Sequence, residues 1–452
     1  MSDDLHIVPE LSEDALPRAH DGRRIRLGSG TAWVVAVQLI AAASTILIGA
    51  IVARWLGPEG KGVLSLLQQS VTLLAVLGEL GLGIAAIYYV SKGEVRPGTV
   101  LGNALVLLGV VSTVAFLGLV VLLRTPLAVV DVSWTHVFVA LGLFAATVLL
   151  SWVGSIVTSV EGTRGAARAS VVASLVTLGI VYWLWVSLRL TPLGVLIASA
   201  TGATLGIVVG LAPAWRALQP VKASMAVFRS MIHYSLRLHA ASAADLVHFR
   251  QDILILGWLA GPSAVGVYSV ALSLAEIASR LPAAIGSAIQ AQASRVSEES
   301  ALDFSARALR LTTFISLVTT GALALVAPVA IPMIFGPSFV PAIGIVYVML
   351  PRMLANSLVW PVTSYQSARG VVYWKVGVLA TVSNAALNIA LIPLLGYHGA
   401  AIAASASNLL LVALLLQRLC RDTNRRPAFF LVPTRDDFKL AKQAIGSYAK
   451  RG

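Results

Sequence analysis

The sequence predicts an all-α, polytopic membrane protein with about twelve transmembrane helices. The first reason is composition: 58% of the 452 residues are hydrophobic and only 12% are charged, whereas soluble globular chains are roughly a quarter charged. The second is spacing, because apolar stretches long enough to cross a bilayer core recur along almost the whole chain. The third is the concentration of Lys and Arg in alternate connections between these stretches.

Each predicted helix is an apolar stretch bounded by charged residues, Gly or Pro. The predicted spans are 31–53, 63–90, 100–123, 136–158, 170–188, 191–211, 233–259, 265–290, 311–335, 341–363, 371–393 and 398–417. This divides the chain into an N-terminal tail (1–30), a six-helix lobe (31–211), a connecting segment (212–232), a second six-helix lobe (233–417) and a basic C-terminal tail (418–452).

Three of these regions are not membrane spans: the two tails and the connecting segment. Residues 1–30 carry six acidic residues ahead of the first basic cluster, which is unlike a cleavable signal peptide and indicates a disordered tail. The 212–232 segment mixes apolar residues with Arg216, Lys222 and Arg229. It is compatible with an amphipathic segment on the membrane surface and equally with a solvated linker.

The distribution of basic residues predicts the orientation. Twelve Lys and Arg residues lie in the even-numbered connections and four in the odd-numbered ones. The even set is Lys92, Arg96, Arg164, Arg168, Arg216, Lys222, Arg229, Arg295, Arg307, Arg310, Arg369 and Lys375, and the odd set is Arg54, Lys61, Arg124 and Arg189. Because basic loops stay in the cytoplasm, both termini are expected to be cytoplasmic. The net charge of +13 is explained by this topology, so nucleic acid is not an expected partner.

An internal repeat supports the division into six plus six helices. The segment Gly57-Pro58-Glu59-Gly60-Lys61-Gly62-Val63-Leu64-Ser65 matches Gly261-Pro262-Ser263-Ala264-Val265-Gly266-Val267-Tyr268-Ser269 at five of nine positions, 204 residues later. In both copies the Gly-Pro pair supplies a sharp turn between two helices. Since six is even, the two lobes share one orientation in the membrane.

The predicted helix 233–259 carries an unusual set of ionisable residues for a membrane span. At about 100° per residue, Arg237, Asp245, His248 and Asp252 fall on one stripe. His239 and Arg250 fall on the other side of the helix. The equivalent positions of the first helix are uncharged: Trp33, Ala41, Ser44, Ile46 and Ile48. This asymmetry favours a functional role, while the alternative is an internal ion pair of Asp245 or Asp252 with an arginine.

Three further charged residues lie inside predicted spans. Glu276 and Arg280 are four residues apart, a spacing at which opposite charges can pair on one helix face; a role in a cavity is the alternative. Arg352 follows Pro351 at the centre of the span 341–363. An arginine at that depth is costly unless water or an anion meets it.

Other patterns limit the possible chemistry. Cys420 is the only cysteine, so an intrachain disulfide and a cysteine-ligated metal cluster are excluded. There is no nucleotide-binding loop of the Walker type, and Gly81-x-Gly83 lies inside a predicted helix instead of after a strand. No cofactor or metal is expected. The small residues Gly194, Ala198, Gly202, Gly206 and Gly210 recur every four positions and predict a helix-packing ridge.

The two turn regions resemble a known family. Ala53-Arg54-Trp55-Leu56-Gly57-Pro58, Gly62 and Gly78-Glu79-Leu80-Gly81-Leu82 resemble the first two helices of the Wzx-type O-antigen and polysaccharide flippases, members of the multidrug/oligosaccharidyl-lipid/polysaccharide exporter superfamily. Asp252-Ile253-Leu254-Ile255-Leu256-Gly257, Gly261-Pro262 and Gly266-Val267-Tyr268 are similar to the seventh and eighth helices of that family. One departure is Glu79, where the family more often has Asp. The resemblance covers roughly residues 31–420.

The resemblance implies two lobes around a central cavity, alternating access, and a place in the inner or plasma membrane. The expected cargo is an oligosaccharide on a polyprenyl pyrophosphate, moved for cell-surface polysaccharide biosynthesis. Arg237, Arg352, Arg250 and Arg280 are the candidate ligands of the pyrophosphate, because guanidinium binds phosphate with two hydrogen bonds. The candidates for coupling to protons or sodium are Asp252, His248 and Asp245. The expected structural motif residues are Gly57, Pro58, Gly62, Glu79, Gly81, Gly261, Pro262, Gly266 and Glu276. Polysaccharide assembly proteins are further candidate partners.

Two alternative functions remain open. A drug or cation antiporter of the same superfamily would have a mainly acidic or apolar cavity, which the arginines oppose. A membrane glycosyltransferase, glycan ligase or polymerase would need a catalytic site and generally a sizeable extracytoplasmic loop, and every odd-numbered connection here is short. We therefore expect a transporter and not an enzyme.

Overall fold

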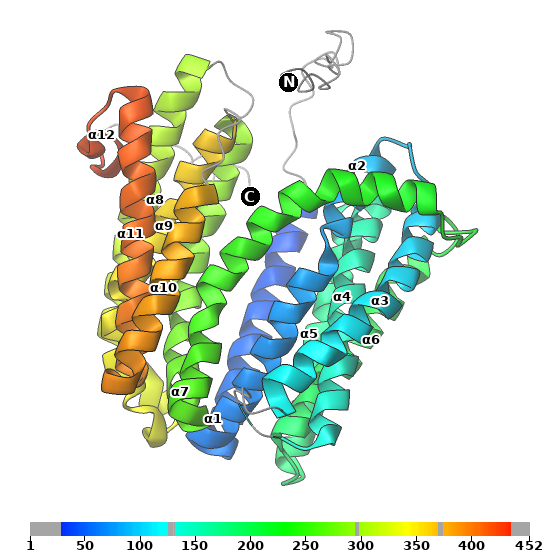
Figure 1. Ribbon diagram of the computed structural model, residues 1–452, viewed down its shortest axis with the longest axis horizontal. Coiled ribbons are helices and arrows are strands. Elements are labelled where there is room, and N and C mark those ends of the chain that lie inside the picture. The colour runs from blue at the N-terminus through cyan, green and yellow to red at the C-terminus, as the bar shows by residue number, and fades with distance from the viewer. Residues whose placement is uncertain (1–28, 125–129, 131, 294–297, 369–373, 435–452) are drawn as a thin grey trace, which may run out of the picture.

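The computed structural model describes residues 29–124, 130, 132–293, 298–368 and 374–434 (Figure 1). Within these ranges the side chains of some helical residues, Arg237, Asp245 and Arg280 among them, are also outside the described set. The elements are α1 (Ser29–Glu79), α2 (Leu82–Ser91), α3 (Pro97–Arg124), α4 (Trp134–Glu161), α5 (Thr163–Val186), α6 (Pro192–Ala214), α7 (Met225–Ala293), α8 (Glu298–Phe335), the 3-10 turn η2 (Pro337–Phe339), α9 (Ala342–Ala368), α10 (Trp374–Leu395), α11 (Tyr397–Thr423) and α12 (Pro427–Leu431). The described residues contain no strand, so the predicted all-α class is confirmed.

Ten helices in the described part of the chain are long and apolar enough to cross a membrane. Two of them, α1 and α7, bend at Gly57 and Gly261, where the backbone leaves the helical region. Each therefore holds two of the predicted spans, and the twelve predicted crossings fit the ten helices. Both glycines have positive φ, 64° and 80°, a conformation that residues with a side chain rarely adopt.

Several predicted boundaries were wrong. The span 63–90 is broken, because α1 ends at Glu79 and α2 begins at Leu82. The helix α7 begins at Met225 and includes the end of the predicted connection 212–232, and α8 begins at Glu298 and includes most of the connection 291–310. The predicted C-terminal tail contains the last turns of α11 and the short α12. Polar helix ends outside the apolar windows gave no hydrophobic period to detect.

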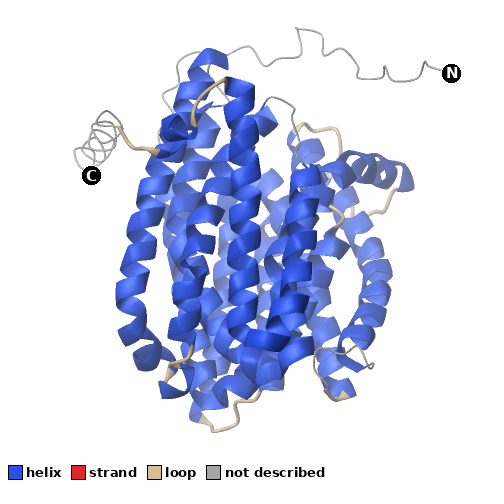
Figure 2. Ribbon diagram, turned by 60° about the vertical axis from the view of Figure 1, so that its left-hand side comes forward, coloured by secondary structure: helices blue, strands red, loops and turns tan. Residues whose placement is uncertain are grey.

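The helices form two groups (Figure 1). The elements α1–α6 pack mainly with one another and make the N-terminal lobe, and α7–α12 make the C-terminal lobe. The two lobes meet chiefly along α1 and α7, and the first part of α7 also reaches over α2 and α3. Figure 2 shows that most helices run side by side along the bundle.

The two ends of the bundle differ. The chain enters α1 and leaves α11 at one end, and the turns at Gly57 and Gly261 lie at the opposite end (Figure 1). Because the number of crossings is even, the chain begins and ends on the same side, and a turn after an odd-numbered crossing lies on the opposite side. Following the predicted orientation, we call these the inner and outer ends.

The exterior of the bundle is apolar where lipid would surround it. One face of α3 exposes Leu105, Val106, Val110, Val114 and Leu117, and the side chains of the last four are 60–64% exposed. A continuous apolar face of this kind is rare on soluble monomers. It is the expected surface of a multi-pass membrane protein.

The small-residue ridge of α6 packs as predicted. A side-chain carbon at Gly206 would lie 2.7 Å from the carbonyl oxygen of Ala169 on α5, and one at Gly202 would lie 2.5 Å from that of Ala173. The backbones of α5 and α6 therefore approach too closely for any residue but glycine.

Candidate functional site: a buried ion pair between two lobe contacts

The strongest polar feature of the C-terminal lobe is an ion pair between α7 and α9. The Arg352 guanidinium donates to Asp252 Oδ2 at 2.7 Å, and the two side chains are only 8% and 1% exposed. The Tyr268 hydroxyl also donates to Asp252 and accepts from Arg352 at 3.3 Å. Arg352 donates further to the carbonyl oxygen of Phe249 at 3.1 Å. The groups that bind one another here therefore come from α7 on both sides of the Gly261 turn and from α9.

This ion pair lies deep in the bundle. Asp252 comes nine residues before the Gly261 turn, and Arg352 comes ten residues after the start of α9. With a rise of about 1.5 Å per residue, both lie about 15 Å from the outer end, half of a bilayer core of about 30 Å. Charges at this depth must pair with each other or face water, and here they pair.

A wider polar layer surrounds the ion pair. Gln251 donates to Asn384 at 2.9 Å, and Asn384 donates to Ser407 at 2.8 Å. His248 is buried beside Asp252, Arg352 and Asn408, and neither of its ring nitrogens meets hydrogen-bond geometry with a described residue. The lobe therefore holds a buried imidazole beside the ion pair, with Asn408 as its nearest polar neighbour.

Arg250 and Glu276 form a second ion pair within α7, across the Gly261 turn. Their charged atoms are 2.6 Å apart, and the side chains are 29% and 39% exposed. Glu276 therefore has Arg250 as a partner, whereas sequence spacing favoured Arg280. The side chain of Arg280 lies outside the described residues, so its pairing with Glu276 stays a prediction.

Of the four residues in the predicted polar stripe of α7, two have side chains that the structure describes. His248 and Asp252 lie together in the buried polar layer, while Arg237 and Asp245 have side chains outside the described set. His239, predicted on the other side of the helix, is buried against the N-terminal lobe, because a side-chain carbon at Gly81 would lie 2.8 Å from its Cβ. The two sides of α7 thus face different surroundings.

At the outer end the repeated turns pack against each other. A side-chain carbon at Gly62 would overlap the carbonyl oxygen of Pro262, and one at Gly266 would overlap that of Pro58. The contact is reciprocal, because each glycine meets the proline of the other repeat. We call these four residues the outer joint. Arg54 adds a third link by donating to the carbonyl oxygens of Met333 and Ile334 at the end of α8.

At the inner end the lobes meet at the break between α1 and α2. Leu80 and Gly81 have positive φ there, 49° and 70°. The Ser235 hydroxyl of α7 donates to the carbonyl oxygen of Leu80 at 3.0 Å, and Trp152 of α4 donates to that of Glu79 at 3.2 Å. The carbonyl groups that lose their helical hydrogen bonds at the break therefore accept hydrogen bonds from side chains of both lobes.

Three tyrosines extend this inner contact. Tyr88 of α2 stacks on Tyr234 of α7 with ring centroids 4.5 Å apart, and Tyr89 packs edge-on against both rings. Lys92 caps the cluster, with its Nζ 2.6 Å from the Tyr88 hydroxyl. We call Leu80, Ser235 and the three tyrosines the inner seam.

Sequence reasoning missed several of these residues. Tyr268 was seen only as part of the repeated turn, although its counterpart Leu64 lacks a hydroxyl; that difference was the available signal. Ser235, Tyr234 and Trp152 gave no signal, because a single serine or aromatic residue in a span is unremarkable until its neighbours are known.

Comparison with known proteins now decides the family. Residues 27–290, more than half of the chain, match the polysaccharide biosynthesis protein family. The chain belongs to that family. A search of curated proteins by sequence found no match. The family membership agrees with the resemblance noted in the turn motifs.

Solved structures share the fold of this polysaccharide biosynthesis protein. Lipid II flippase MurJ in its inward closed conformation matches with a TM-score of 0.70 and 12% identity, over 91% of this chain and 90% of MurJ. A multidrug resistance MATE transporter matches in its inward-facing conformation with a TM-score of 0.61 and 14% identity, over 87% of this chain and 98% of that one. The outward-facing conformation gives 0.57 and 14%, over 88% and 97%. The predicted two-lobed transporter fold is confirmed.

Proposed function

We propose that this protein is a flippase that moves an oligosaccharide linked to polyprenyl pyrophosphate across the inner or plasma membrane. Membership of the polysaccharide biosynthesis family supports the glycan, and the fold shared with a lipid II flippase supports the movement of a lipid-linked cargo. The single observation that carries the mechanism is the Asp252–Arg352 ion pair at mid-bilayer depth.

The ion pair is suited to exchange charge with cargo. A pyrophosphate that reaches Arg352 would compete with Asp252 for the guanidinium, which can bind phosphate oxygens through two hydrogen bonds. The released carboxylate would then take up a proton or a sodium ion, with His248 and Asp245 as the neighbouring groups of the same helix. Anion binding and cation binding are in this way tied to one pair of side chains.

The other arginines would bring the pyrophosphate to that depth. Arg237, Arg250 and Arg280 all lie on α7, and Arg250 keeps 29% of its side chain exposed while paired with Glu276. A series of fixed cations along one helix lowers the free energy of an anion in a region where bare charge is costly.

Alternating access is the proposed cycle, with a central cavity between the lobes 31–211 and 233–417. In the present structure the lobes touch at the outer joint and at the inner seam. Opening the cavity to either side requires one of these contacts to separate. Both termini would be cytoplasmic, where polysaccharide assembly proteins would deliver the cargo.

The experiment is a flipping assay with purified protein in liposomes. A fluorescent lipid-linked oligosaccharide is placed in both leaflets, and the fraction that an external reagent can quench is followed over time. Wild-type protein should increase the exchange above that of protein-free liposomes, and an imposed proton or sodium gradient should change the rate. Absence of exchange in either gradient would contradict the proposal.

Matched variants separate the charge-exchange mechanism from a structural role of the pair. Asp252→Asn leaves Arg352 without its carboxylate and should therefore lower stability, but the protein that still reaches the membrane should flip cargo independently of the gradient. Arg189→Ala is the control, because Arg189 is exposed near the outer end and should flip normally. Unchanged gradient dependence in Asp252→Asn would remove Asp252 from the coupling.

A second candidate function is export of a drug or organic cation, favoured by the likeness to MATE transporters. The same liposomes distinguish it when a fluorescent lipophilic cation replaces the glycolipid. Gradient-driven cation uptake without glycolipid exchange would select the antiporter.

A further inference from the structure

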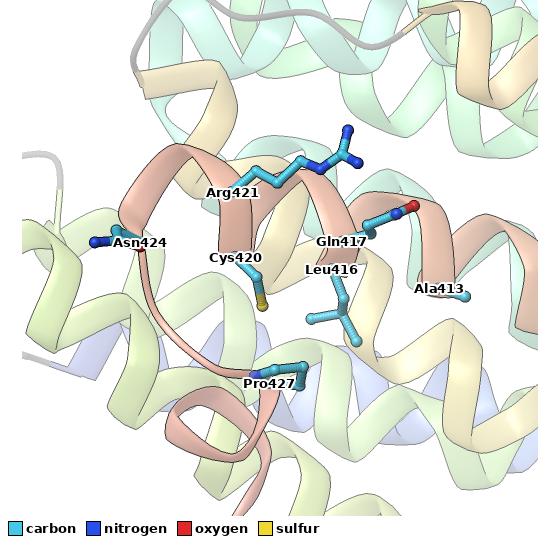
Figure 3. Close-up of a pocket in the computed structure, with 7 residues that line it drawn as sticks. All are labelled: Ala413, Leu416, Gln417, Cys420, Arg421, Asn424 and Pro427. Carbon is cyan, nitrogen blue, oxygen red and sulfur yellow. The ribbon is translucent and has the colours of Figure 1, made fainter.

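A pocket of about 530 Å³ lies at the inner end of α11, outside the site described above. Leu416, Cys420 and Pro427 line its apolar part, and Gln417, Arg421 and Asn424 line its polar part. Figure 3 shows Leu416, the Cys420 thiol and Pro427 converging on one side of α11, with Arg421 extending from the other edge of the helix. The pocket is an open groove at the surface of α11 and not an enclosed cavity, so an occupant would lie along the helix with one side exposed.

The wall of the pocket is held in place by α12. The chain turns back after α11, and the backbone N–H of Arg425 donates to the carbonyl oxygen of Cys420 at 3.1 Å. Phe430 is then buried against the lobe at 1% exposure, and Arg310 of α8 donates to the carbonyl oxygen of Phe429 at 2.8 Å. Pro427 therefore has a fixed position opposite Cys420.

The rim of the pocket is strongly basic. Arg421 lines the pocket, and Arg425 and Arg426 lie between its lining residues Asn424 and Pro427; Arg418 is four residues from Asp422, the only acidic residue of this stretch. At about 100° per residue, Asp422 points well away from Arg421 around the helix. Arg421, Arg425 and Arg426 are exposed, so the polar side of the pocket presents positive charge to whatever lies beside it.

The depth of the pocket matches a membrane surface. The helix α11, Tyr397–Thr423, contains a stretch apolar enough to cross a membrane, and its first arginine is Arg418. Leu416 therefore lies at the end of the apolar stretch, and Arg421 to Arg426 lie beyond it. Clusters of Lys and Arg directly beside a transmembrane helix are typical of sites that bind anionic headgroups. An occupant of this pocket would need an apolar part and a negative part in that order.

We propose that this pocket binds an anionic phospholipid. One acyl chain would lie over Leu416, Cys420 and Pro427, and the headgroup phosphate would bind Arg421 together with Arg425 or Arg426. The two competing occupants are the chain's own C-terminal residues and a second copy of the chain, and both carry positive charge. Residues 435–452 carry five basic and two acidic residues, and a second copy would bring the same arginines, so both would be repelled.

Cys420 allows a direct test, because it is the only cysteine of the chain and lines the pocket. The rate of its alkylation by N-ethylmaleimide is measured on full-length protein in nanodiscs of phosphatidylcholine, with and without phosphatidylglycerol. Bound anionic lipid should slow alkylation several-fold, and Arg421→Gln with Arg425→Gln should abolish the slowing. Inorganic phosphate or glycerol phosphate added to the buffer should have no effect.

A matched control removes the general influence of a negative membrane, which attracts protons and slows any thiol reaction near it. Ser91→Cys in a Cys420→Ser background places the thiol at an exposed position at the inner end of α2. Equal slowing at this control site, or no slowing at Cys420, would overturn the proposal. Protection that appears without phosphatidylglycerol and disappears when residues 435–452 are removed would assign the pocket to the chain's own tail and overturn it as well.

Discussion

The two lobes share the Gly-Pro turn but differ in the side chains that flank it. In the N-terminal lobe the turn at Gly57 lies between Ile48 and the buried Leu64. In the C-terminal lobe the turn at Gly261 lies between Asp252 and Tyr268, which occupy the matching positions 204 residues later. The fourth helix of the N-terminal lobe, α4, buries apolar residues such as Val148, whereas α9 buries Arg352.

This difference shows that the fold itself does not need the charges. The N-terminal lobe makes the same hairpin and the same outer joint with Ile48, Leu64 and Val148 at the positions of Asp252, Tyr268 and Arg352. Replacing a buried ion pair by well-packed apolar residues is often neutral or stabilising, so stability does not explain the Asp252–Arg352 pair. A function that requires charge at mid-bilayer depth explains it better.

The largest expected effect comes from breaking the pair on one side. Arg352→Ala leaves the Asp252 carboxylate buried without its cation, which typically costs about 3–5 kcal/mol. We expect the thermal unfolding midpoint of the purified protein, followed by size-exclusion chromatography after heating, to fall sharply and membrane abundance to drop. A variant as stable as wild type would mean that water or another cation reaches Asp252.

Making the C-terminal lobe resemble the N-terminal lobe sharpens this test. The double variant Asp252→Leu with Arg352→Met removes both charges and keeps apolar volume. It should recover most of the stability lost by Arg352→Ala, yet it should not flip cargo in liposomes. Recovery of flipping together with stability would show that the pair only ties α7 to α9.

The outer joint gives the second-largest effect, and here the two lobes should behave alike. Gly62→Ala and Gly266→Ala each place a side-chain carbon on a backbone oxygen of the other repeat. Overpacking typically costs about 1–3 kcal/mol, and we expect the upper end of that range because backbone oxygens cannot rotate away. Both variants should lose stability to a similar degree in the same heating assay. Gly109→Ala is the control, because nothing lies within 4 Å of a side-chain carbon there.

Much of this architecture could be predicted from the sequence, and the physical reasons also explain which parts could not. Apolar length predicts membrane spans because lipid imposes it, and the two Gly-Pro turns predict the repeat because their backbone geometry is demanding. The reciprocal contact of Gly62 with Pro262 could not be predicted, since a local motif does not report its partner. The break after Glu79 was missed because Leu80 gives no signal for positive φ, and Gly81, which has a φ of 70° at the break, was wrongly placed inside a helix.

The candidate site was predicted in part. Asp252, His248 and Arg352 stood out because ionisable residues are rare in spans, and the ion-pair alternative named Asp252 with an arginine elsewhere. That Arg352 is this arginine depends on the register of α9 against α7, which sequence does not reveal. The role of Arg352 toward an anionic cargo stays a prediction for the liposome assay.

The third prediction concerns the hydroxyl that distinguishes Tyr268 from Leu64. Tyr268→Phe removes the hydrogen bond to Asp252 and retains the ring. Hydrogen bonds to charged groups contribute about 1.5–3 kcal/mol, so the loss of stability should be smaller than for Arg352→Ala. In the Asp252→Leu, Arg352→Met background the same substitution should cost much less, because the carboxylate is gone. An equal cost in both backgrounds would show that Tyr268 acts through packing.

The smallest expected effect lies at the inner seam, where the lobes meet through unlike residues. Ser235→Ala removes one hydrogen bond to the carbonyl oxygen of Leu80, which typically contributes about 0.5–1.5 kcal/mol. If the seam must separate in each cycle, this loss should lower stability slightly and raise or maintain the rate of flipping. A loss in stability alone would be common to any packing defect, so the rate is the informative measurement. Ser230→Ala, on an exposed face of α7 where the hydroxyl bonds only within its own helix, is the matched control and should change neither quantity. A fall in flipping for Ser235→Ala at normal abundance would mean that the seam stays closed during transport, and the opening would then have to occur between other helices.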